Sequence, residues 1–353
     1  MHQFLEGIME TECRFLLDHT ILEKGLSLKS VNLFLSNFNN GKHQIDKPSP
    51  IESQHLKNGL RQTSAQILML SLLLPFIVEK HCDTDRLQNF ILLLKILSLC
   101  LSHVLTMDHV SLLKRMVKKY LMQFNILYPG KFTPKHHFLI HLPTQIVLFS
   151  VLTEQWAMRF EAFHAILKRL TKVLHNAKNL SFSLMMRMSS LQAYKIHSNK
   201  ANFLTHAAIK PQVKKKMPLS EVSEQQSIIA CIKLADEECE VVQLSSLKWY
   251  GPVLSRGDTI LVPPLSASCF QLPKFATVIE IFCIQEKYVI LCRELKTIAY
   301  CADLNAYEVK CEQAAFIKAL DITENSNLLQ VMNIKQGTKD YIILRQNSHP
   351  EFS

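Results

Sequence analysis

The chain has 353 residues, of which 48% are hydrophobic and 20% are charged, and its formal net charge is +10. This composition excludes an intrinsically disordered chain, and the length predicts two domains that each bury a core. The charge is unevenly divided, because residues 1–216 carry a net +15 and residues 217–353 a net −5. We expect phosphate backbones as the partner of the basic part, with a merely solvated basic surface as the alternative.

Residues 1–200 are predicted to form a mainly helical domain. Apolar residues recur at helical spacing in residues 4–36, and the breakers of Asn37–Pro50 predict a loop. Long helices are expected from there to about Leu127. Asp83 and Asp108 stand where N-caps of two of these helices are expected.

Two apolar runs in this domain resemble membrane spans in composition. Leu68–Val78 is too short and contains Pro75, and Phe90–Leu105 has Lys95 near its middle. A span needs about 20 apolar residues, so both runs are predicted to be buried core helices. We expect no membrane association.

A long helix is predicted from about Thr153 to His175. Its apolar residues recur at spacings of three and four, which predicts a buried face: Trp156, Phe160, Phe163, Leu167, Leu170 and Leu174. A second helix is expected at Ser181–His197. Three methionines are expected in its core: Met185, Met186 and Met188.

Residues 201–235 are predicted to be a basic and polar linker that contains Lys214, Lys215 and Lys216. From residue 236 to 353 the apolar period changes to two, which predicts a small antiparallel β barrel or sandwich and an α+β fold overall. Gln285 and Glu286 are expected to connect a hairpin. The expected strands are Val241–Leu247, Thr259–Val262, Ala276–Phe282, Tyr288–Leu295, Tyr307–Lys310, Phe316–Leu320 and Tyr341–Leu344.

The ten cysteines show no C-x-x-C spacing, and no secretory signal pattern occurs at the start of the chain. Many lie within apolar runs, where a reduced cysteine behaves as a small hydrophobic residue. We therefore expect reduced thiols in a nuclear protein, with the cytoplasm as the alternative location.

One face of the predicted helix at 153–175 combines a carboxylate with cations. Glu161, His164, Lys168, Lys172 and His175 follow one another at spacings of 3, 4, 4 and 3, so they share a face. The face is either solvated, with a contact from Glu161 to Lys168 or His164, or it holds a metal ligand beside a phosphate-binding surface.

Four histidines could indicate a zinc site: His136, His137, His141 and His164. No cysteine lies near them in the sequence. The arrangements expected of a zinc site, C-x-x-C or H-x-x-x-H together with a carboxylate, are not assembled. Packed or hydrogen-bonded histidines are the favoured interpretation.

Several segments resemble, in order, the end of CACTA-type (En/Spm-like) transposases of animal genomes. The main blocks are Lys131–Pro143 (KFTPKHHFLIHLP) and Trp156–His164 (WAMRFEAFH). The opening Met1–Gly7 (MHQFLEG) is similar to an aspartate-x-Met-His-Asp-x-x-Glu-Gly block of that group. Leu60-Arg61-Gln62 and Tyr307-Glu308-Val309 match further landmarks, so the resemblance covers nearly the whole chain.

The resemblance implies a DDE nuclease on an RNase H-like core, with a helical insertion ahead of the last acidic residue. In such an enzyme three carboxylates hold two divalent cations that activate water and then a 3′-hydroxyl. Glu161 is the position that matches the third acid.

The chain departs from this pattern at the other acids. The aspartate expected two residues before the Met-His pair would precede Met1, and the residue after the pair is Gln3. The segment that carries the first acid would also lie upstream, together with core strands of the RNase H-like fold. One carboxylate cannot hold two Mg²⁺ ions, so we expect no cofactor in this chain and Mg²⁺ at Glu161 only if missing residues supply the other acids.

The sequence thus predicts a transposase-derived, catalytically incomplete protein, not an enzyme, with residual nonspecific DNA binding. The predicted DNA contacts are Arg159, His164, Lys168, Arg169, Lys172, Lys178, Lys214, Lys215 and Lys216. One alternative is a module that binds protein partners through its β domain and has no role with nucleic acid. The other is an active nuclease that sequence upstream of the chain completes.

Overall fold

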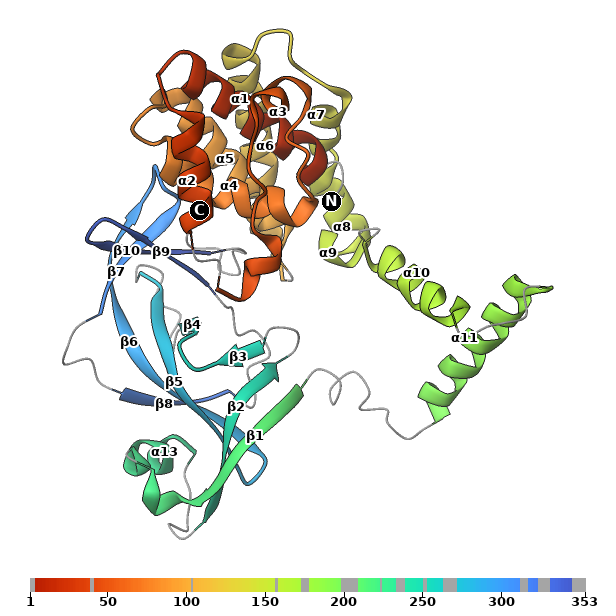
Figure 1. The fold of residues 1–353 in the computed structure, drawn as a ribbon, viewed down its shortest axis with the longest axis vertical. Coiled ribbons are helices and arrows are strands. Elements are labelled where there is room, and N and C mark those ends of the chain that lie inside the picture. Colours follow the sequence, from red (N-terminus) through yellow and green to blue (C-terminus); the bar gives the residue numbers. More distant parts are fainter. Residues whose placement is uncertain are drawn as a thin grey trace. The chain divides into compact units, whose positions relative to one another are not determined.

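The computed structural model describes residues 4–38, 41–102, 104–155, 158–172, 178–197, 209–222, 224–232, 239–249, 253–262, 272–311, 317–322 and 331–344. Helices come first along the chain and a curled antiparallel sheet follows, so the predicted α+β class is confirmed (Figure 1). The chain divides into a helical unit (1–158, 299–308 and 341–353) and a sheet unit (159–298 and 309–340). This boundary at residue 158 differs from the expected one at residue 200.

The helical unit begins with a π-helix and continues with α-helices of 4 to 21 residues. Their bounds are η1 Phe4–Met9, α1 Glu10–Leu22, α2 Leu28–Asn37, the 3₁₀ helix η2 Gly41–Asp46, α3 Ser53–Asn58, α4 Ser64–Val78, α5 Thr84–Cys100, α6 Met107–Leu127, α7 Pro134–Leu139, α8 Leu142–Phe149 and α9 Leu152–Gln155. The two apolar runs of the sequence form α4 and α5, as predicted. No described helix is long and apolar enough to span a bilayer.

Side-chain caps fix where several of these helices begin. Thr63 caps α4, and Thr106 caps α6 by accepting a hydrogen bond from the backbone N–H of His109. The prediction of Asp108 as a cap is wrong, because Asp108 lies within the first turn of α6. Asp83 is the N-cap residue of α5, and its carboxylate contacts Lys24 at 2.6 Å instead of capping the helix.

A buried carboxyl group joins α1 to α6 inside the helical unit. Glu12 of α1 is 1% exposed, and the hydroxyl of Tyr120 of α6 donates to its Oε1 over 2.7 Å. Burial raises the pKa of Glu12 to about 7, although the Tyr120 hydrogen bond and the charge of Arg86 lower it. The folded protein therefore keeps this carboxyl protonated over a pH range in which the unfolded chain ionises it.

The wild type should lose stability as the pH rises from 4.5 to 7, and we predict that the substitution Glu12→Gln abolishes this loss. In the wild type the folded-state pKa lies above the unfolded value, so stability falls as pH rises through this window and levels off above it. The free energy of unfolding of the wild type should fall by about 3 kcal/mol across this window. Urea unfolding at pH 5 and pH 8 measures it, and the exposed Glu286→Gln is the control. Equal pH dependence of the wild type and Glu12→Gln would contradict the prediction.

The described residues of the sheet unit contain two long helices, two short helices and most of the strands. The helices are α10 Met158–Thr171, α11 Leu180–His197, the 3₁₀ helix η3 Leu219–Glu221 and α13 Gln225–Ile232. The strands, including the parts assigned to the helical unit, are β1 Ile209–Pro218, β2 Glu240–Trp249, β3 Val253–Ser255, β4 Thr259–Val262, β5 Lys274–Ile284, β6 Lys287–Cys301, β7 Ala306–Lys310, β8 Ile317–Asp321, β9 Met332–Gln336 and β10 Lys339–Ile343.

The sheet has the order β1-β2-β5-β6-β7-β10-β9, with β3, β4 and β8 paired to the side of this path. Its antiparallel ladders curl into half of a barrel (Figure 1). Two apolar clusters form the core, one around Leu247, Ile260 and Ile290, and the other around Ile228 and Phe282. All seven predicted strands are confirmed, six of them to within two residues at both ends, whereas β6 continues six residues past the predicted end at Leu295.

The predicted linker at 201–235 is wrong over residues 209–218, which form β1. This strand pairs antiparallel with β2, with Lys216 opposite Val242 and Met217 opposite Val241. Part of the remaining stretch forms α13, whose Ile228 and Ile232 are buried in the core of the sheet unit. Strand β1 was not predicted because its three consecutive lysines interrupt the alternation of apolar and polar residues that indicates a strand.

The predicted hairpin connection between β5 and β6 is confirmed, and it is conformationally costly. Gln285 and Glu286 both adopt left-handed conformations, with φ of 48° and 66°. Such a two-residue turn matches the twist of the strands, but residues other than Gly, Asn and Asp enter it at a cost.

The double substitution Gln285→Asn with Glu286→Gly should raise the free energy of unfolding by about 1 kcal/mol, because both residues then suit the turn. Thermal unfolding followed by circular dichroism measures the change. In the turn between β9 and β10, Gly337 has φ of 62° and Gly337→Ala should act in the opposite direction. A destabilised double variant would contradict this account of the turn.

Candidate nucleic-acid interface

The helix predicted at 153–175 corresponds to α9 and α10. Trp156 and Ala157, which lie between these two helices, are outside the described residues, as is Leu174. Glu161 and Arg159 lie in the first turn of α10, but their side chains are outside the described part of the structure. The role of Glu161 as a third acid therefore stays a prediction.

The remaining predicted contacts on and after α10 face solvent. His164, Lys168, Arg169 and Lys172 are exposed, whereas Leu167 and Leu170, on the predicted apolar face, are half-buried. Lys178 is also exposed, two residues before α11. Exposed cations on a helix are accessible to a phosphate backbone without any rearrangement of the core.

Helix α11 differs from its prediction. Met188 is buried, as expected, but Met185 and Met186 are 62% and 52% exposed, so their assignment to the core is wrong. Phe182, one turn before Met185 and Met186, is 67% exposed on the same face. Arg187 of α11 is exposed too and adds a cation that is not among the predicted DNA contacts.

These cations belong to a segment without acidic residues. Between Ala162 and Ser220 the chain contains no Asp or Glu. The same segment holds eleven cations: Lys168, Arg169, Lys172, Lys178, Arg187, Lys195, Lys200, Lys210, Lys214, Lys215 and Lys216. We call it the acid-free segment. Because no carboxylate within it can neutralise the cations, it creates a positive local potential that attracts anions.

The lysine triplet lies on the edge strand β1. Lys214, Lys215 and Lys216 are exposed, and a register shift between Val213 and Lys215 places Lys214 in a bulge. Lys215 Nζ lies 3.5 Å from Glu221 Oε2, and Lys216 Nζ lies 3.8 Å from an Oε2 of Glu240 in β2. Exposed pairs of this kind contribute about 0–1 kcal/mol, so a phosphate can replace the carboxylate. Lysines on an edge also hinder pairing with another sheet, which is their structural role.

The carboxylates near the start of the chain serve the helical unit. Glu10 Oε1 accepts the backbone N–H of Leu60 over 2.8 Å, and Glu6 accepts the hydroxyl of Ser64. Glu12 is bound by Tyr120. Within the described residues no three His, Cys, Asp or Glu side chains are arranged to hold a metal ion.

The histidines of the resemblance block have structural roles where the structure describes them. His136 is buried, and its Nδ1 accepts the backbone N–H of Thr133 over 3.1 Å, so the other ring nitrogen carries the proton. Burial lowers the pKa of His136, which favours this neutral form. His137 and His141 contact each other through their Nε2 atoms at 3.2 Å on the surface. A pair of histidines alone does not complete a zinc site.

Comparison with known protein families, with curated proteins and with solved structures finds no match to this chain.

Proposed function

We propose that this chain is a catalytically incomplete relative of CACTA-type transposases that binds DNA in the nucleus without sequence specificity. The acid-free segment is the observation that carries the proposal, because it presents exposed cations on α10, α11 and β1. Lys168 and Arg169 of α10 and Lys172, the residue after this helix, are exposed cations, and no acidic residue follows them in the segment. Such a surface neutralises phosphates and reads no base edges.

Nonspecific binding of this kind has a characteristic salt dependence. Each neutralised phosphate releases condensed counterions, so the logarithm of the affinity falls linearly with the logarithm of the salt concentration. For about six phosphate contacts the affinity should fall by about 10³-fold between 50 and 200 mM salt. Fluorescence anisotropy with two labelled duplexes of equal length and different sequence should give the same affinity for both.

The triple substitution Lys168→Gln, Arg169→Gln and Lys172→Gln should lower the magnitude of the salt slope by about 2–3, because each lost phosphate contact removes about 0.9 from it. The matched control removes the same charge from exposed positions of α6, through Lys114→Gln, Arg115→Gln and Lys118→Gln. The control should leave the slope nearly unchanged. Equal slopes in the two triple variants, or a flat salt dependence of the wild type, would refute the proposal.

The exposed apolar face of α11 favours a second function, the binding of a protein partner. Phe182, Met185 and Met186 lie on one face of this helix and are mostly exposed. Capture of partners by the full chain, with and without nuclease treatment of the extract, separates the two functions. Partners that DNA bridges are lost after the treatment, whereas partners of α11 remain and are lost on Phe182→Ser.

A further inference from the structure

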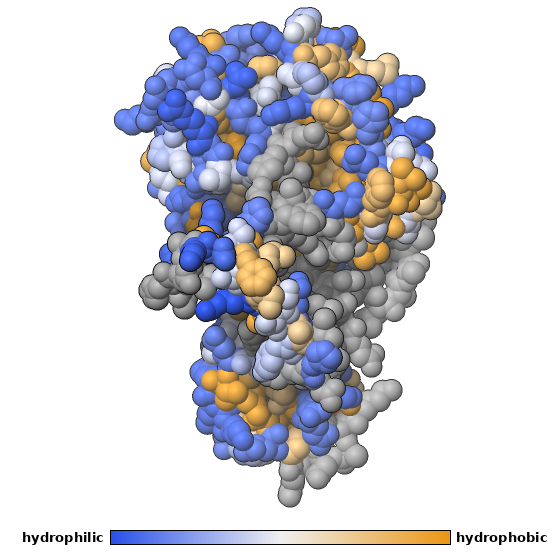
Figure 2. All heavy atoms as spheres, turned by 90° about the vertical axis from the view of Figure 1, so that its right-hand side faces the viewer, coloured by the Kyte–Doolittle hydropathy of each residue, from blue (hydrophilic) through white to orange (hydrophobic). Residues whose placement is uncertain are grey.

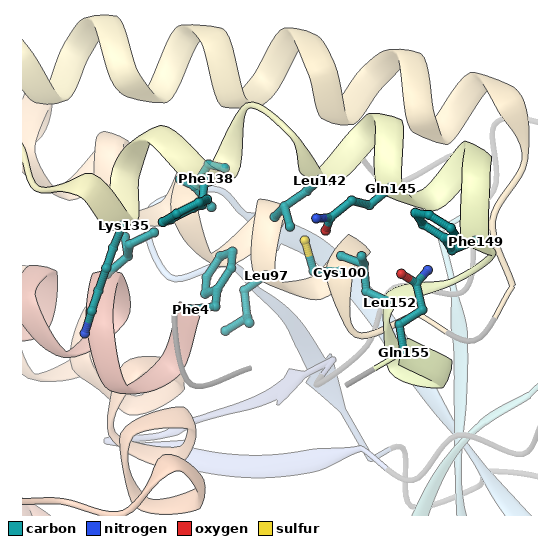
Figure 3. Close-up of a pocket in the computed structure, with 12 residues that line it drawn as sticks. Phe4, Leu97, Cys100, Lys135, Phe138, Leu142, Gln145, Phe149, Leu152 and Gln155 are labelled. Atoms are coloured by element: carbon teal, nitrogen blue, oxygen red, sulfur yellow. The ribbon is translucent and has the colours of Figure 1, made fainter. Parts of the chain in front are cut away.

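The helical unit contains an apolar groove that takes no part in the proposed DNA binding. Its volume is about 310 Å³, and its walls come from η1, α5 and the consecutive helices α7, α8 and α9 (Figure 3). Ligand pockets in proteins span about 300–1,000 Å³, so this groove suits a small, single-chain ligand. The residues that form its apolar wall include Phe4, Leu97, Phe138, Leu142, Phe149 and Leu152.

The aromatic rings at the rim of the groove are open to solvent. Phe138 is 44% exposed and Phe149 is 65% exposed, and both line the groove. Apolar side chains gather over this unit on the face shown in Figure 2. An apolar chain laid against these rings would remove their surface from water, at about 25 cal/mol for each Å².

Polar groups in the groove are few. Lys135 lies at one end, Gln155 lies at the other, and the amide of Gln145 lies between them, near Cys100 (Figure 3). The Gln155 amide donates to the carbonyl oxygen of Ser150. Cys100, between the two ends, points its sulfur into the groove.

Lys135 is the cation of this site. Its stem lies against Gly7 so closely that a Cβ at that position would come within 2.4 Å of Lys135 Cδ. Its Nζ lies 3.4 Å from the carbonyl oxygen of Glu6, a long contact, and no carboxylate of the described residues forms a salt bridge with it. A ligand that matches this arrangement has an apolar chain and one anionic head group.

We propose that this groove binds a medium-chain fatty carboxylate, with its carboxylate at Lys135 and its hydrocarbon chain along Phe4, Leu142 and Phe149. The positive charge at the end of the groove disfavours cationic amphiphiles. The site is independent of the acid-free segment, so failure of the DNA-binding proposal leaves it unaffected.

Isothermal titration of the full chain with octanoate, decanoate, 1-decanol and decyltrimethylammonium tests the ligand class. Decanoate has two more methylenes than octanoate. It should bind more tightly than octanoate, by about four-fold for each of these methylenes that is buried. Decanoate should also bind more tightly than decyltrimethylammonium. No binding of decanoate, or binding no tighter than that of the cationic amphiphile, would overturn the proposal.

Two substitutions with matched controls test the position of the ligand. Lys135→Gln should weaken decanoate binding by about two- to five-fold and leave 1-decanol binding unchanged, because one exposed ion pair is lost. Its control is Lys131→Gln, at an exposed position that does not line the groove.

Phe149→Ala should weaken the binding of both ligands by about five-fold, because it removes apolar contact area. The control is Leu148→Ala, because Leu148 is 66% exposed and does not line the groove. All four positions are exposed, so the variants should fold, which their unfolding curves verify. If either substitution has the same effect as its control, the ligand does not occupy this groove.

Discussion

Glu12 is buried between α1 and α6, and its carboxyl group must keep a hydrogen-bond partner there. Tyr120 supplies that partner, and Phe124 of α6 and Tyr128, the residue after α6, continue the aromatic packing from it. Phe124 packs on His136 with 4.4 Å between ring centroids and on Tyr128 at 5.1 Å. This cluster brings α1, α6 and α7 into one core. The position of α7, and with it Lys135, therefore depends on the packing around Glu12.

Much of the fold was predictable because the apolar periods are regular. Leu68–Val78 formed a buried helix, and the period of two after residue 236 located most of the strands. Strand β1 was not predictable, because an edge strand needs only one partner and can carry consecutive lysines. The cap of α6 was assigned to Asp108 although Thr106 occupies it, since both residue types suit the position.

The candidate sites were predictable to different degrees. The shared face of the cations on α10 was predictable from the sequence, because residues spaced three and four apart lie on the same face of a helix. The exposure of Met185 and Met186 could not, since a methionine at helical spacing fits a core and a surface alike. The groove could not be predicted from the sequence either. Its walls join η1, α5 and α7 to α9, which are separated by up to about 150 residues, and only the packing brings them together.

The chemical character of Cys100 has a consequence for the groove. Burial raises the pKa of this thiol to about 12, so at neutral pH the sulfur stays protonated. The thiolate is the reactive species towards oxidants and alkylating agents, and it is nearly absent here. The floor of the groove therefore keeps its apolar character under mild oxidative stress, when a more acidic cysteine in the same place would be converted to a polar product.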